Sequence, residues 1–65
     1  MILSKEIRMQ IVENMLYCIA CTGSPKEISI DYISEGISPE HILAFETAAL
    51  NIWKKYGMTI LLYLN

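Results

Sequence analysis

The sequence predicts an all-α fold: a small helical domain of two long amphipathic helices and a short connecting helix. Apolar residues recur at the three- and four-residue spacing of an α-helix over residues 4–21 and again over residues 39–56. Each of these segments begins next to a serine that can cap a helix, and glycine and proline separate them. The chain has 65 residues, so we expect a single domain spanning residues 1–65.

The first helix is expected to begin after Ser4 and to run to about Cys21. Ser4 is a favourable N-cap residue, but the third helical position holds Ile7 instead of the glutamate that would complete a capping box. Apolar side chains cover an arc of about 200° around this helix, whereas a helix packed on one neighbour needs little more than about 100°. The helix is therefore expected to contact two neighbours.

The middle of the chain can be interpreted in two ways. Residues 22–25, "TGSP", break the first helix, and Lys26 and Glu27 can begin another. Ile28, Ile30 and Tyr32 alternate as in a strand, yet the same stretch also suits a short helix. We favour the helix, because a lone strand leaves backbone groups unpaired. The alternative is an α+β fold in which residues 28–32 and 58–64 are strands.

The second long helix has the stronger start signal. Ser38 is a favourable N-cap, Pro39 suits the first turn, and Glu40 lies near the positive end of the helix. We expect this helix to run to Tyr56 and to be terminated by Gly57. The apolar residues 58–64 would then form a final short helix or a strand.

The composition predicts a partner. Apolar residues make up 54% and charged residues 18% of the chain, against about 45–50% and about 25% in ordinary soluble domains. So short a chain has a marginal core, and exposed apolar surface usually marks an interface. We therefore expect a homodimer or another homo-oligomer, or an obligate partner protein. The residues expected at this partner or dimer interface are Met9, Val12, Leu16, Ile19, Phe45, Ile52, Trp53 and Tyr56.

Two charged residues fall inside the apolar arcs. Arg8 lies within the arc of the first helix, and Glu46 lies within the arc of the long second helix. An unpaired charge is not buried, so each side chain either reaches the rim or finds a partner. We predict a buried ion pair between Arg8 and Glu46, within one chain or across a dimer. The alternative is that both point outward at the edge of the stripe.

Residues 32–41, "YISEGISPEH", resemble the corner of a helix-turn-helix, which makes a DNA-binding transcriptional regulator an alternative function. The charges argue against a nucleic-acid partner. Residues 27–46 contain five acids and no lysine or arginine, whereas DNA affinity depends largely on basic side chains that neutralise phosphates.

Cys18 and Cys21 form a C-x-x-C pair, and His41 is the lone histidine. A structural zinc needs four ligands, which a symmetric dimer could supply, so a zinc-stapled dimer is a further alternative. A solitary pair is a weak signal, and we expect both cysteines to be small buried residues. His41 is expected to face solvent. We predict no metal and no cofactor.

No nucleophile or other catalytic signature stands out, so we do not expect an enzyme. The chain has no apolar run long enough to span a membrane, and its first residues lack the layout of a signal peptide. We expect a small cytoplasmic regulatory or adaptor protein, from a bacterium or a phage, that binds a partner protein through an apolar helical face.

Overall fold

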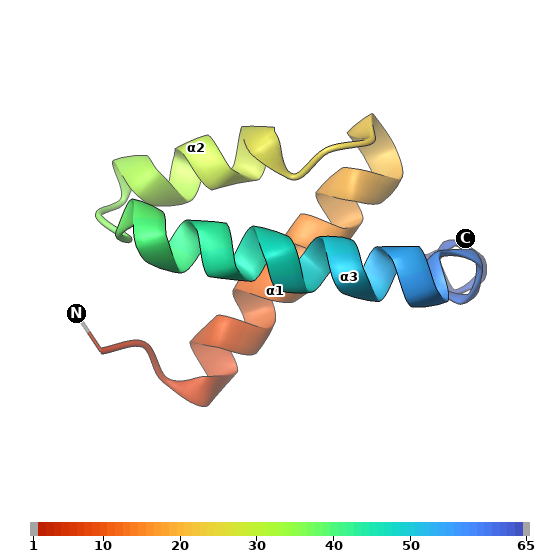
Figure 1. Ribbon diagram of the computed structural model, residues 1–65, viewed down its shortest axis with the longest axis horizontal. Coiled ribbons are helices and arrows are strands. Elements are labelled where there is room, and N and C mark those ends of the chain that lie inside the picture. Colours follow the sequence, from red (N-terminus) through yellow and green to blue (C-terminus); the bar gives the residue numbers. More distant parts are fainter. Residues whose placement is uncertain (1, 65) are drawn as a thin grey trace.

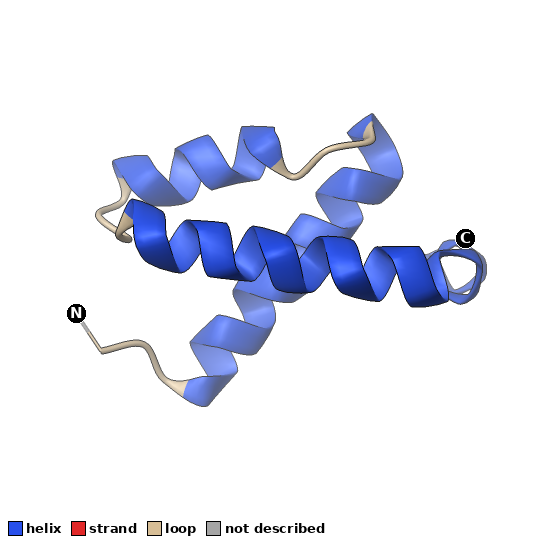
Figure 2. Cartoon of the chain, in the orientation of Figure 1, coloured by secondary structure: helices blue, strands red, loops and turns tan. Residues whose placement is uncertain are grey.

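Three α-helices make up the computed structural model, which describes residues 2–64 apart from the side chains of residues 61, 63 and 64. The helices are α1 (Lys5–Thr22), α2 (Lys26–Ser34) and α3 (Pro39–Leu64). No strand occurs within residues 2–64 (Figure 2). The all-α prediction is therefore confirmed, and the alternative with strands at 28–32 and 58–64 is wrong. No helix in this part of the chain is long and apolar enough to cross a membrane.

The helices pack around the crossing of α1 and α3. Figure 1 shows α1 passing obliquely behind α3, while α2 runs beside α3 in the opposite direction. The contact between α1 and α3 is the most extensive of the three. The buried apolar core consists of Ile11, Met15, Ile19, Ile42 and Ala49, all from these two helices. The short α2 covers one side of the crossing.

The ends of α1 follow from local capping. The Ser4 hydroxyl accepts a hydrogen bond from the Ile7 N–H at 3.2 Å. Gly23 adopts φ 84°, and its N–H donates to the Ile19 carbonyl at 2.8 Å. This left-handed conformation satisfies a free carbonyl at the end of a helix and favours glycine. The predicted span of 4–21 is correct to within one residue.

The predicted short helix is confirmed as α2. The Ser24 hydroxyl accepts from the Lys26 N–H at 3.2 Å and so supports its first turn. The side chain of Asn14 on α1 donates to the Tyr32 hydroxyl at 2.7 Å, which joins α2 to α1. Gly36, with φ 101°, then turns the chain into α3.

The start of α3 is as predicted, but its end is not. The Ser38 hydroxyl accepts from the His41 N–H at 3.3 Å. The helix then continues through Gly57 to Leu64, so the prediction that Gly57 ends it is wrong. Gly57 lacks the positive φ of a terminating glycine. The Trp53 ring, one turn earlier, lies next to Gly57, and a Cβ at this position would contact the ring at 3.4 Å.

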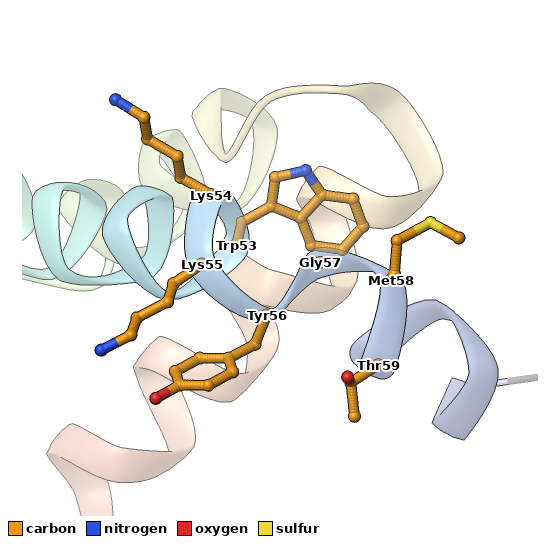
Figure 3. Close-up of a pocket in the computed structure, with 7 residues that line it drawn as sticks. All are labelled: Trp53, Lys54, Lys55, Tyr56, Gly57, Met58 and Thr59. Atoms are coloured by element: carbon orange, nitrogen blue, oxygen red, sulfur yellow. The ribbon is translucent and has the colours of Figure 1, made fainter.

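The glycine also coincides with a bend. Figures 1 and 3 show α3 changing direction just beyond Gly57. Glycine accommodates such bends more readily than other residues. An apolar segment after a glycine therefore continued the helix here instead of starting a new element.

Gly57→Ala tests this correction and is expected to stabilise the protein by up to about 1 kcal/mol, because glycine costs about that much in a helix interior. The new methyl would meet Trp53 at an ordinary contact distance. Gly23→Ala is the matched control and should destabilise by about 1–2 kcal/mol, since its φ is left-handed. Urea unfolding followed by circular dichroism measures both. A loss of stability in Gly57→Ala equal to that in Gly23→Ala would mean that Gly57 terminates the helix.

Candidate functional site: an apolar groove between α1 and α3

An open groove with a volume of about 580 Å³ lies between α1 and α3. We call it the α1–α3 groove. Its apolar lining is Met9, Val12 and Leu16 from α1 and Phe45, Ala48 and Ile52 from α3; the charged residues Lys5, Arg8 and Glu13 also line it. The two apolar sets have the same spacing of three and then four residues, which places each set on one face of its helix. No residue of α2 is part of this lining.

The groove lies next to the core on both helices. Val12 follows the buried Ile11, and Leu16 follows the buried Met15. Successive residues of a helix point about 100° apart, so this stripe lies beside the core, and Val12 and Leu16 pack against the core with part of their surface. The α2 contacts lie on the other side, where Asn14 bonds to Tyr32. The broad apolar arc of α1 therefore divides into a part that packs on α3 and a part that remains open.

The structure brings five of the eight predicted interface residues together in this groove: Met9, Val12, Leu16, Phe45 and Ile52. The other three lie elsewhere. Ile19 is buried in the core, and Trp53 packs against the core and Gly57. Tyr56 is half exposed and lies one turn beyond Ile52 on α3.

The surroundings of Tyr56 form a separate hollow of about 380 Å³ at the bend of α3. Figure 3 shows the Trp53 ring over Gly57, while Lys55 and Tyr56 extend from the other side of the ribbon. The Lys55 ammonium lies 5.4 Å from the centre of the Tyr56 ring. Among the described side chains, those of residues 53–59 line this hollow, so they all come from one short stretch of α3.

Sequence reasoning missed three groove residues: Lys5, Glu13 and Ala48. For Lys5 and Ala48 a helical signal was present. Lys5 lies one turn before Met9, and Ala48 lies between Phe45 and Ile52 at the same three- and four-residue spacing. Periodicity alone does not say which part of a broad apolar arc stays open. The packing of the helices decides this, and with it which residues line the groove.

A second set of apolar side chains is exposed on α2 and α3. Ile30 is 65% exposed, and Ile33, Leu43 and Leu50 are exposed as well. The molecule therefore presents apolar surface outside the groove as well.

Glu46 is the buried charge of the structure, with a relative exposure of 6%. The Ser29 hydroxyl donates to Glu46 Oε2 at 2.7 Å. The Lys26 ammonium donates to Oε1 at 3.3 Å and lies 3.2 Å from Oε2. Ser29 and Lys26 both belong to α2, so this carboxylate anchors α2 on α3.

The predicted partner of Glu46 was Arg8, and within the chain this pairing is wrong. Arg8 is exposed and lines the α1–α3 groove together with Phe45. Phe45 and Glu46 are consecutive and therefore point about 100° apart, one toward the groove and the other toward α2. Lys26, and not Arg8, pairs with Glu46, because α2 runs alongside α3 and brings its first turn next to Glu46.

The cysteines and the histidine do not converge. Cys18 is half-buried, and its thiol donates to the Ser24 carbonyl at 3.1 Å. The expectation that Cys21 is buried is wrong: two positions after the buried Ile19, it points about 200° away and is exposed. His41 is exposed as expected, and its Nδ1 lies 3.0 Å from the Ser38 hydroxyl oxygen. Within the described residues, no three His, Cys, Asp or Glu side chains are grouped to hold a metal ion.

Ser29→Ala tests the anchor and is expected to lower the free energy of unfolding by about 1–3 kcal/mol, since it leaves a buried carboxylate without its best donor. Lys26→Met should cost less than about 1 kcal/mol, because the Lys26 side chain is 72% exposed. Arg8→Met is the control and should change stability by no more than about 0.5 kcal/mol. Urea denaturation measures all three. A larger loss in Arg8→Met than in Ser29→Ala would show that Arg8 pairs with Glu46.

Comparisons with known proteins do not place the chain in a family: no family model matches it, and neither a curated protein nor a solved structure is significantly similar to it. A function therefore has to be inferred from the groove, its charges and the packing around it.

Proposed function

We propose that the chain is a small, non-enzymatic regulatory or adaptor protein, cytoplasmic and of bacterial or phage origin, that binds a partner protein in the α1–α3 groove and also associates with itself. The main observation in support of this proposal is the open apolar surface of the groove. Two helices present matching apolar stripes there, and α2 leaves this side uncovered. An open apolar surface of this kind usually marks an interface.

The lining supports a protein ligand. Phe45 and Met9 supply large, adaptable apolar contacts, and such residues are enriched at interfaces. Each Å² of apolar surface that a partner covers contributes about 25 cal/mol. Lys5, Arg8 and Glu13 give the groove a charged border, which favours one partner and one orientation over others. The lining contains no serine, cysteine or histidine that would act as a nucleophile or a base.

The exposed area of the chain supports the same proposal. A folded monomer of 7.4 kDa is expected to expose about 4,200 Å². This chain exposes 4814 Å², an excess of about 600 Å² over that scaling. A standard interface buries about 800 Å² on each partner. The excess is about three quarters of that area, so the chain exposes more surface than a compact monomer of its mass.

The corner between α2 and α3 gives less support to the alternative of a DNA-binding regulator. Gly36 turns the chain there, but the residues around it are the exposed acids Glu35 and Glu40. These carboxylates would repel phosphates at the position where a recognition helix meets DNA.

Met9→Lys and Tyr17→Lys form a matched pair for testing the groove. Both residues are on α1, and they are 54% and 57% exposed, but only Met9 lines the groove. Tagged wild-type and variant chains are incubated with lysate of the source cell, and the captured proteins are quantified by mass spectrometry. We expect a protein that the wild type and Tyr17→Lys capture equally and that Met9→Lys loses at least tenfold, because a buried ammonium opposes binding.

Two results would contradict the proposed function. The first is equal capture by Met9→Lys and the wild type, which would place any interface outside the groove. The second is the absence of any protein that the wild type captures above the level of an untagged control.

A further inference from the structure

We infer that the α1–α3 groove of one copy receives α2 of a second copy, so that the chain associates head to tail. This inference rests on the proposed function, because it names one occupant of the same groove. It depends on the signs of the charges on two sides of the molecule and on the apolar residues beside them.

The groove has a net positive border, although the protein as a whole is acidic. Its border holds two of the five cations, Lys5 and Arg8, and one of the seven acids, Glu13, which gives a formal charge of +1. The formal charge of the whole chain is −2, so the residues outside the groove together carry −3. The occupant that best complements this groove combines apolar residues with acids.

The outer surface of α2 has this combination. Glu27, Asp31 and Glu35 recur at four-residue intervals, so they form one stripe along the helix and its C-terminal cap, and all three are exposed. Ile30 lies beside them and is 65% exposed. The one cation of α2, Lys26, is held by Glu46 on α3. The acids of α2 are thus left free to meet Lys5 and Arg8 of another copy.

The main competing arrangement is a two-fold dimer in which the groove faces itself. A two-fold axis places the same patch on both sides of the interface, so two borders of net charge +1 would meet, and Glu13 is the one acid of each border that could face Lys5 or Arg8 of the other copy. Two like charges 4 Å apart in water repel by about 1 kcal/mol, and opposite charges attract by as much. The charges therefore favour the contact between the groove and α2.

The two surfaces lie on different sides of the molecule. The groove is lined by α1 and α3 on the side that α2 leaves open, and the acid stripe lies on α2. One copy therefore receives α2 from a second copy and offers its own α2 to a third. Such contacts build a ring or an open chain.

Charge reversals at exposed positions test the arrangement. Arg8→Glu alters the groove, and Asp31→Lys alters the acid stripe. Each new charge suits its helix end, since Arg8 is in the first turn of α1 and Asp31 is in the last turn of α2. Glu40→Lys is the control, because it changes the net charge as Asp31→Lys does but lies on α3. Sedimentation velocity measures the mass of each variant over a range of concentrations, after circular dichroism has verified its helix content.

We expect the wild type to exceed the monomer mass as concentration rises, and its association to weaken with added salt. Arg8→Glu and Asp31→Lys should each associate at least about tenfold more weakly, which corresponds to about 1.4 kcal/mol, while Glu40→Lys should behave like the wild type. An equal mixture of Arg8→Glu and Asp31→Lys should associate again, because the first variant retains an intact α2 and the second retains an intact groove.

Two outcomes would overturn the inference. If Asp31→Lys behaves like Glu40→Lys while Arg8→Glu still weakens association, the groove pairs with another groove. The proposed function then stands, but this occupant of the groove is wrong. If the wild type is monomeric at every concentration, self-association fails, and the capture experiment with Met9→Lys decides separately whether the groove binds another protein.

Discussion

The crossing of α1 over α3 is the contact on which the rest of the structure depends. Its five buried apolar side chains form a small core, as expected for a chain of 65 residues. Each helix carries a wider apolar arc than this crossing covers. The remainder of both arcs therefore stays open, and the residues next to the core, such as Val12 and Phe45, become the lining of the groove. The packing that stabilises the fold is thus also what leaves a binding surface.

The buried carboxylate of Glu46 is the polar contact that holds α2 on α3. Ile28 and Tyr32 of α2 pack against the core but stay partly exposed, and Ser29 is the buried residue of this helix. The hydrogen bond from Ser29 and the ion pair with Lys26 hold it on one side of α3. A buried polar contact of this kind favours one arrangement over its alternatives even where its net stabilisation is small. Because α2 also carries three exposed acids, the same contact separates an acidic side of the molecule from the groove.

The parts of the fold that local chemistry decides were predictable from the sequence. Serine caps and the glycine at the end of α1 are local signals, and they located three helix ends to within a residue or two. Gly57 was misread because a glycine near a helix end and a glycine beneath an aromatic ring look the same in a sequence. Its φ and the position of Trp53 decide between them.

The partner of the buried charge could not be predicted from the sequence for a similar reason. Periodicity gives the direction of a side chain on its own helix, but it does not say which neighbour lies there. Glu46 was correctly expected to need a partner, yet only the placement of α2 identifies Lys26 as that partner.

One face of α1 belongs to the core while the adjacent face is open, and two methionines of α1 report on this difference directly. Met15 is fully buried, and Met9 is 54% exposed in the groove. Carbon-13 labelled methionine methyl signals can be recorded with a soluble paramagnetic agent, in a dilute sample of the Arg8→Glu chain so that association does not cover the groove. The structure predicts strong broadening of the Met9 methyl signal and none of the Met15 signal. Equal protection of both methyl groups would contradict the account, because it would mean that the α1–α3 groove is closed.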